Sequence, residues 1–361
     1  MFDACLRAAE RSLDAPLAST ATLRNAIACL SRFGDDHRRA MADGGELRRA
    51  AQAGAARLQK QIAGTVLPAL AGLFDAAAAR GWQAEDAPEA VTPLEAAALL
   101  SALTEWQRAS GSGTEAGAQA VRLCTRMTAD AKACVDRFKS LQRPEDSPDY
   151  RAAATDLAQL EAMIRLAGRL NQTKPQAELR RLRDHYAKTA LLSALGVIDR
   201  GGDAADMFVH FDIAAMLVSV EHVVAVISRT IDVVEQEREH SHPHVETLSE
   251  HVVRDFASGL MRLAPTYVRM LKNTAAARGT AAPEFGFSVL RVLLQITRLI
   301  RILHYHLDDE TLADAANKIV ADVSDLRGKL LHTARNDQPL LLRMHETLDS
   351  LAAASVPDAR P

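Results

Sequence analysis

The chain has 361 residues, of which 48% are hydrophobic, 25% charged and 4% aromatic, and its net charge at pH 7 is −3. These proportions exclude a disordered or fibrous chain, and a charge so close to zero predicts no nucleic-acid partner. The four cysteines all precede residue 135 and show no CxxC spacing, which predicts reduced thiols and not a disulfide scaffold.

The first residues differ from a secretory signal. Asp3 stands where such a signal carries positive charge, and Arg7 and Glu10 interrupt any apolar run. The longest uncharged apolar stretch, residues 61–74, is short and rich in small side chains, so we predict no transmembrane segment. We therefore expect a cytoplasmic protein, and the excess of Arg and Ala favours a GC-rich bacterial source. Secretion by a route without a signal peptide stays open.

Helix start and stop signals occur from the N-terminus onward. A first short helix should close at Asp14, and Ser19 or Thr20 can cap a second helix that Gly34 ends. Thr92-Pro93-Leu94-Glu95 is a capping box with proline at the first helical position, which predicts a helix ended by the glycines that follow residue 110. Another helix is predicted over about residues 114–141.

Between these elements, residues 46–80 predict a third helix, because their apolar side chains recur at spacings of three and four. Pro68 should interrupt this helix, since proline has no N–H to donate. Three glycines also lie inside it, although each costs about 1 kcal/mol relative to alanine: Gly54, Gly64 and Gly72. We expect them where a neighbouring helix approaches closely; the alternative is contact with a membrane or a partner groove.

Residues 142–149 combine two prolines with acidic and small polar side chains, which is typical of a linker. The next helix can start at Ser147 with Pro148 and should reach about Gly168, and another should run from Thr173 to about Gly196. Residues 203–242 then contain neither Gly nor Pro, so we predict a single helix of about 30–36 residues, apolar on nearly all sides and therefore central in a bundle.

Further helices complete the chain. One restarts after Pro243 and should be kinked at Pro265, and others are expected over residues 287–307, 311–334 and 340–354. Asp308 or Asp309 can serve as an N-cap between two of them.

No segment predicts a strand, so the expected fold is all-α, built from bundles of long antiparallel helices without a sheet. We expect an N-terminal Ala-rich subdomain over residues 1–141, a linker at 142–149, a C-terminal bundle over 150–355 and a frayed tail at 356–361.

The densest group of possible metal ligands is Glu237, His240, His242 and His244. In an extended turn the three histidines could converge on one divalent cation, and Glu237 with His240 has the i, i+3 spacing of carboxylate-bridged metal bundles. The other interpretation is a solvated turn between helices that happens to be rich in histidine, and on that interpretation no cofactor is predicted.

Two further groups of charged residues are candidates. Arg291, Arg298 and Arg301 follow one helix and could bind an anion or an acidic partner, or could form the wet side of an amphipathic helix. Glu221 and His222 lie in the most apolar segment, where we expect a buried polar pair.

No phosphate-binding glycine loop, nucleophile elbow or His-Glu-x-x-His motif is present in the sequence. We therefore predict a helical protein–protein interaction module, an adaptor, regulator or effector, without catalytic activity. Its partner would be another protein or a second copy of the chain. The alternative is an enzyme or a ligand- or metal-binding bundle with a polar pocket between helices 203–240 and 284–307. An exposed apolar groove would favour the interaction module, and a polar cavity would favour the alternative.

Overall fold

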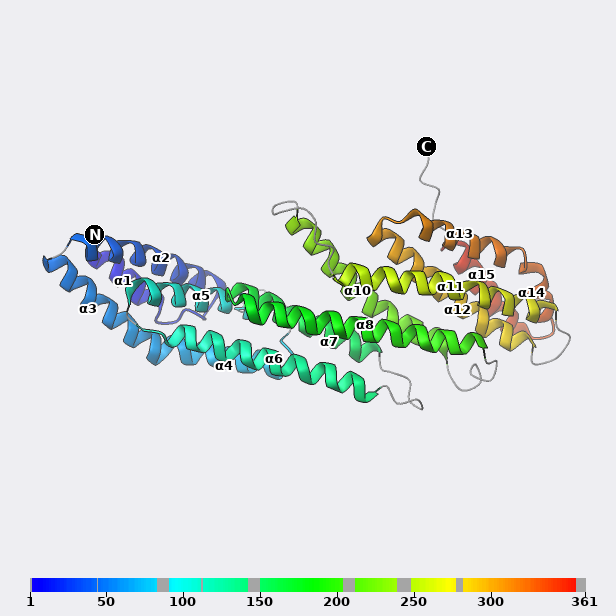
Figure 1. Cartoon of the computed structure of the whole chain (residues 1–361), viewed down its shortest axis with the longest axis horizontal. Coiled ribbons are helices and arrows are strands. Elements are labelled where there is room, and N and C mark those ends of the chain that lie inside the picture. The colour runs from blue at the N-terminus through cyan, green and yellow to red at the C-terminus, as the bar shows by residue number, and fades with distance from the viewer. Residues whose placement is uncertain are drawn as a thin grey trace, which may run out of the picture. The chain divides into compact units, whose positions relative to one another are not determined.

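The computed structural model describes residues 2–43, 45–82, 91–111, 113–141, 150–203, 212–238, 248–276 and 282–354 (Figure 1). Within these ranges the chain folds into helices joined by short turns, and no described residue belongs to a strand. The predicted all-α fold is confirmed.

The chain forms two compact units. Unit 1 consists of Met1–Cys134 and Ala158–Leu182, and unit 2 of Val135–Leu157 and Arg183–Pro361. The chain changes unit within three helices, α6 (Glu115–Leu141), α7 (Tyr150–Arg169) and α8 (Thr173–Asp203). The predicted linker at 142–149 lies outside the described residues, and the predicted domain boundaries stay a prediction.

Unit 1 contains the N-terminal helices and parts of α6, α7 and α8. The helices before α6 are α1 (Phe2–Ser12), α2 (Thr20–Asp43), α3 (Gly45–Gln61), the π-helical turn η1 (Ile62–Val66), α4 (Leu67–Ala79) and α5 (Pro93–Ser110). The predicted end of the second helix at Gly34 is wrong, because α2 continues to Asp43. Gly34 lies within α2 and faces the Trp106 side chain of α5: a methyl group added at Gly34 would lie 3.7 Å from Cδ1 of that indole.

The predicted capping box at the start of α5 is confirmed. The hydroxyl of Thr92 accepts a hydrogen bond from the Glu95 amide at 3.2 Å, and the Glu95 carboxylate accepts one from the Thr92 amide at 3.1 Å. The helix ends at Gly111, whose φ of 65° is a left-handed conformation that glycine adopts without strain. Local sequence therefore sets both ends of α5.

The packing of α2 on α5 includes two buried nitrogen atoms. His37 and Trp106 are each 3% exposed, and both rings contact Phe33, with centroids 6.1 and 6.3 Å away. Neither Nδ1 of His37 nor Nε1 of Trp106 has a hydrogen-bond partner among the described residues. Burial lowers the pKa of His37, because a charged imidazolium would lose its hydration there.

This burial predicts a loss of stability in acid. Since the pKa of His37 is lower in the folded chain than the value of about 6.5 in an unfolded one, the unfolded state binds more protons as the pH falls below that value. The free energy of unfolding should therefore fall as the pH drops from 7.5 to 5.5. In His37→Phe, which keeps an aromatic ring beside Phe33, urea denaturation at the two pH values should show a smaller fall. An identical fall in both proteins would contradict this assignment.

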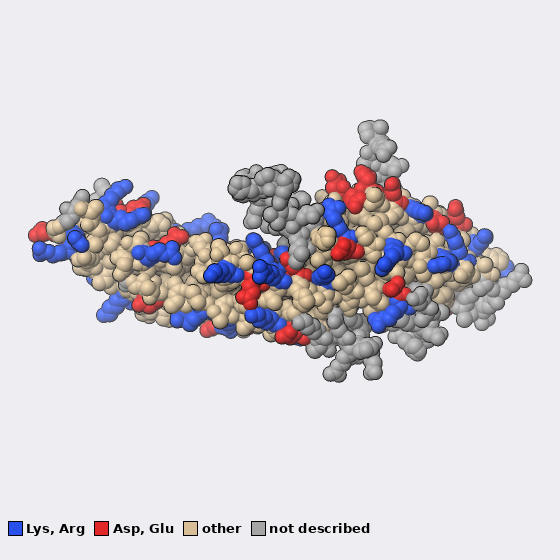
Figure 2. Space-filling model, viewed as in Figure 1, with Lys and Arg blue, Asp and Glu red and all other residues tan. Residues whose placement is uncertain are grey.

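Unit 2 contains the rest of α6, α7 and α8 and the C-terminal helices. These are α10 (Ile213–Arg238), α11 (Leu248–Ala276), α12 (Ala282–Leu307), α13 (Glu310–Ser324), α14 (Arg327–Thr333) and α15 (Gln338–Ala352). On the face that Figure 2 shows, acidic side chains gather over α13 and basic ones are scattered over the rest of the unit.

The prediction of one long helix over residues 203–242 is wrong. Instead, α8 runs through Gly196 to Asp203, and α10 begins at Ile213. The Asp212 carboxylate accepts a hydrogen bond from the Ala215 amide at 3.0 Å, so it caps a new helix start. The expected central position is also wrong, since among the described contacts it is α12 that packs against α10, α11, α13, α14 and α15.

The predicted cap before α13 is confirmed at Asp309. Its carboxylate accepts hydrogen bonds from the amide and the hydroxyl of Thr311 at 3.0 and 2.6 Å, and the hydrogen bond from the Thr311 side chain is the main cause of its lowered pKa. The expected single helix over residues 311–334 is instead the pair α13 and α14, which the turn at Asp325 separates.

Candidate functional site

The first candidate site begins at Pro68, where proline interrupts the helical run of unit 1. Proline cannot donate a backbone hydrogen bond, and its ring crowds the preceding turn. The chain adapts with the wider turn η1, in which the Leu67 amide donates to the carbonyl of Ile62, five residues back. The predicted interruption is therefore present, as a π-helical turn inside a continuous helical run.

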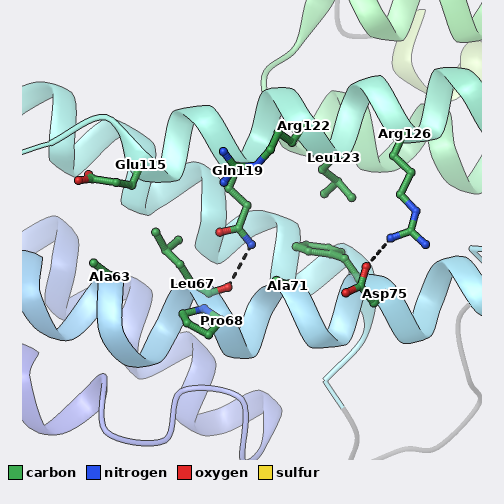
Figure 3. A pocket seen from close by; sticks show the side chains of 11 residues that line it. Ala63, Leu67, Pro68, Ala71, Asp75, Glu115, Gln119, Arg122, Leu123 and Arg126 are labelled. Carbon is green, nitrogen blue, oxygen red and sulfur yellow. Dashed lines mark hydrogen bonds and ion pairs between the residues drawn. The ribbon is translucent and has the colours of Figure 1, made fainter.

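Beside this turn, an open groove of about 440 Å³ lies between η1–α4 and α6 (Figure 3). Its apolar wall consists of Ala63, Leu67, Pro68, Ala71, Phe74 and Leu123. Ala63 and Ala71 have side chains too short to fill the space between the two helices, and the groove remains open there. We call it the α4–α6 groove.

Gln119 joins the two walls of the α4–α6 groove. Its side chain is 8% exposed, and Nε2 donates to the carbonyl of Leu67 at 3.1 Å (Figure 3). This buried hydrogen bond ties α6 to the first turn of α4 and holds the groove at a set width.

The charged groups at the rim of the groove are mostly engaged. Arg126 forms an ion pair with Asp75 and lies 5.9 Å from the centroid of the Trp82 ring. Glu115 accepts hydrogen bonds from side-chain amides of unit 1, including that of Gln59 at 2.6 Å. Arg122 is exposed and forms no hydrogen bond or ion pair with any described residue. Arg122 is therefore the rim cation that no described carboxylate pairs, while Glu115 keeps its negative charge among neutral hydrogen-bond donors.

The expectation that another helix of the chain packs on the glycines of this run is wrong for Gly64 and Gly72. Both are exposed, and a methyl group added at either would meet no atom within 4 Å. Gly54 is buried. The outer face of α4 beside the groove is thus made of small residues that no described part of the chain covers, and the face that Figure 2 shows has wide areas of unit 1 without charge.

Among the described residues, one helical run, Gly45–Ala79, is long and apolar enough to cross a membrane by its length and composition. A third of its most apolar window, 33%, is buried inside unit 1. Core helices of globular proteins have the same length and composition, so this finding does not by itself assign a membrane span. The predicted lack of a transmembrane segment stays a prediction.

A second candidate site lies where the alternative function placed it, between α10 and α12. A pocket of about 410 Å³ is lined there by Glu221 of α10 and by Arg298, Arg301, Ile302, Tyr305 and His306 of α12. We call it the α10–α12 pocket. It opens to solvent, and its charged groups come from both helices.

The structure separates the three arginines of the predicted stripe. Arg291 forms an ion pair with Asp212 at 3.0 Å and does not line the pocket. Arg298 and Arg301 do line it, at the i, i+3 spacing that places them on one side of α12. Two of the three predicted residues are therefore brought together beside Glu221.

The predicted burial of Glu221 and His222 as a pair is wrong. His222 is exposed and Glu221 is half-buried, because consecutive helical residues point about 100° apart and only Glu221 faces α12. In the described chain neither side chain has a hydrogen-bond partner.

The predicted metal ligands cannot be placed. His240, His242 and His244 lie outside the described residues, and the side chain of Glu237 is not described either. Among the described residues, no group of three or more His, Cys, Asp or Glu side chains gathers closely enough to hold a metal ion. The metal site stays a prediction.

The cysteines are free, as predicted, and two of them are buried. Burial raises the pKa of the Cys124 thiol to about 11, so this group stays protonated at neutral pH and is a poor nucleophile.

The groove residues on α6 were not among the predicted site residues; they are Gln119, Arg122 and Arg126. One signal was present: Gln119 occupies a position on the apolar side of a helix otherwise marked by Ala116, Ala120 and Leu123. A glutamine there needs a buried partner, but the partner, a carbonyl at Leu67, is 52 residues away and cannot be read from spacing.

No protein-family model matches the chain, and no curated protein sequence matches it. Among solved structures the chain is similar to a "circular tandem repeat protein with novel repeat topology and enhanced subunit contact surfaces", with 14% identity over 98% of this chain and 82% of that one. The TM-score is 0.30, and at that value the likeness carries no argument about this protein.

Proposed function

We propose that this protein is a protein–protein interaction module whose α4–α6 groove binds an amphipathic helix of a partner protein. The observation that carries the proposal is an open apolar groove between two helices, next to a helix face of small residues that the described chain leaves uncovered. Apolar grooves of this kind accept the apolar face of a helix, and glycine and alanine on the outer face allow its backbone to approach closely.

The rim charges specify the chemistry of the partner. Arg126 and Glu115 are held by groups of unit 1, whereas Arg122 is the cation without a described partner. A bound helix that places a carboxylate near Arg122 gains a charge-assisted contact there. The expected partner segment is therefore an amphipathic helix with small apolar residues on one face and an Asp or Glu at its border.

A photo-crosslinking experiment can find this segment. Ala71 lines the groove, and Thr125 is exposed on α6 without lining it. Ala71→p-benzoylphenylalanine should capture a helical segment of one partner in cells, and Thr125→p-benzoylphenylalanine should capture it much less. Equal capture at both positions, or crosslinks at Ala71 to lipid alone, would overturn the proposal.

The binding strength should depend on Arg122. A synthetic peptide of the captured segment should bind Arg122→Glu about tenfold more weakly than the parent protein, because reversing one rim charge replaces attraction with repulsion. Arg165→Glu, at an exposed arginine of unit 1 outside the groove, is the matched control and should leave the affinity within about twofold. Fluorescence anisotropy of the labelled peptide measures the affinity of each variant. An equal loss of affinity in both would mean that the peptide responds to the overall charge of the protein and not to Arg122 in particular.

A further inference from the structure

The α10–α12 pocket of unit 2 carries an excess of positive charge that the proposed helix-binding groove does not use. Its lining brings two arginines of α12 together with one carboxylate of α10. A pocket of about 410 Å³ is within the usual size range for small-molecule sites.

The two arginines have donors to offer. Arg298 is exposed and contacts no described hydrogen-bond or ion-pair partner. One guanidinium N–H of Arg301 donates a hydrogen bond to the carbonyl of Ala353 at 3.3 Å, and this acceptor is neutral. Arg301 forms no ion pair with a described residue. By contrast, Arg291 on the same helix is neutralised by Asp212. Neither of the two pocket arginines is therefore ion-paired with a described residue, and with the one carboxylate of Glu221 the pocket keeps a net positive charge.

Tyr305 and Ile302 give the pocket its apolar surface. Tyr305 is 83% exposed, more than any other large hydrophobic side chain exposed among the described residues. Its ring contacts the His306 ring edge-on, with the centroids 5.4 Å apart and an angle of 88° between the ring planes. Ile302 is half-buried beside it. An aromatic ring this open, next to two arginines, can stack against a flat ring or cover the carbon body of a ligand.

Glu221 stands on the opposite wall and restricts the choice of ligand. It is half-buried and has no described partner, so its carboxylate can accept hydrogen bonds from a hydroxyl group. The same carboxylate repels an anion placed directly against it. A ligand that fits both walls has its negative group at the arginines and a hydroxyl group some ångströms away.

We propose that the α10–α12 pocket binds a small phosphate monoester, with the phosphate at Arg298 and Arg301 and a hydroxylated body between Tyr305 and Glu221. A phosphate monoester carries nearly two negative charges and three acceptor oxygens, which suits two guanidinium groups on one helix face better than a single carboxylate does. The proposal concerns unit 2 and is independent of the groove in unit 1.

Isothermal titration of the full chain at low ionic strength tests the site, with adenosine monophosphate, ribose 5-phosphate, inorganic phosphate and succinate as probes. The two esters should bind saturably, and succinate at least tenfold more weakly. Absence of saturable binding of either ester up to about 10 mM, a free energy of roughly −3 kcal/mol, would overturn the proposal. Succinate binding as tightly as the esters would overturn the choice of phosphate.

Three variants locate the ligand in the pocket. Arg298→Ala and Arg301→Ala should each weaken ester binding about tenfold, whereas Arg262→Ala, at an exposed arginine of α11 outside the pocket, should leave it nearly unchanged. Glu221→Gln should strengthen the binding of inorganic phosphate, because it removes a repulsive charge, and should weaken that of ribose 5-phosphate, because a neutral amide oxygen is a weaker acceptor for the sugar hydroxyl than a carboxylate. Equal losses in all the arginine variants, or no opposite response in Glu221→Gln, would contradict the assigned pose.

The variants are expected to fold, since these arginines are exposed and Arg298 has no described contact to lose. Arg298→Lys keeps the charge but not the planar fork, and should retain part of the affinity. If circular dichroism shows native helix content and Arg298→Lys binds no better than Arg298→Ala, the arginine is not a ligand of the phosphate.

Discussion

Asp156→Ala is expected to lower the free energy of unfolding of unit 2 by about 2–3 kcal/mol. The carboxylate of Asp156, on α7, is 7% exposed and accepts hydrogen bonds from the Tyr186 hydroxyl of α8 at 3.0 Å and from Arg137 of α6 at 2.7 Å. It therefore joins three helices. Tyr186 is 1% exposed, so the alanine variant removes an acceptor from a hydroxyl group that water cannot reach. The side chain of Arg137 is 57% exposed and can turn to water, which keeps its share of the loss small.

Asp156→Asn separates the two contributions. The amide keeps an oxygen that can accept from Tyr186 but loses the charge that faces Arg137, so we expect a loss of about 1 kcal/mol. Urea denaturation followed by circular dichroism measures both variants. A loss in Asp156→Asn as large as that in Asp156→Ala would show that the ion pair with Arg137, and not the buried hydroxyl, carries the stability.

Substitution of two helical glycines by alanine should have opposite effects. Gly201→Ala is expected to destabilise the protein by about 1–2 kcal/mol, because the new methyl group would press on the Ile213 side chain and lie 2.8 Å from the hydroxyl oxygen of Tyr267. That tyrosine is fully buried and donates to the carbonyl of Ile198 at 2.6 Å, so it cannot move without cost.

Gly72→Ala is the matched counterpart. A methyl group there meets no atom within 4 Å, so only the higher helix propensity of alanine remains, and we expect a gain of about 1 kcal/mol. Thermal unfolding should show a higher midpoint for Gly72→Ala, by roughly 2–4 °C, and a lower one for Gly201→Ala. A destabilised Gly72→Ala would mean that the outer face of α4 is covered in the intact protein. If Gly72→Ala is more stable but binds the partner peptide more weakly, Gly72 allows the bound helix to approach closely.

The helix starts that were predicted correctly are those capped by a hydrogen bond between residues close together in the sequence. Thr92 with Glu95 and Asp309 with Thr311 are separated by two or three residues, so their hydrogen bonds form wherever a helix begins there. A glycine, or the lack of one, was a less consistent signal: Gly111 ends α5 as predicted, but two other predictions failed. Gly34 does not end α2, and residues 203–242 contain no glycine although the chain starts a new helix after Asp212.

The candidate sites were predictable only in part. A pocket was expected between the segments that became α10 and α12, and two of its arginines, Arg298 and Arg301, belong to the three that were named because they follow one helix. Nothing in the spacing could show that Glu221 faces them while His222 points to water. The groove of unit 1 was missed, since it needs Pro68 of one helix and Gln119 of another.

The amino-acid sequence by itself determined that this protein is all-α and where several of its helices begin, because backbone hydrogen bonding, proline and capping side chains act within a few residues of one another. Only the tertiary structure decided which helix faces meet. In the folded chain Gly72 is exposed, Gly201 lies next to the Tyr267 hydroxyl, and Gln119 donates a hydrogen bond to the Leu67 carbonyl. These outcomes depend on contacts between residues far apart in the chain, where the same side chains can pack in many ways and the free energy of the whole core selects one.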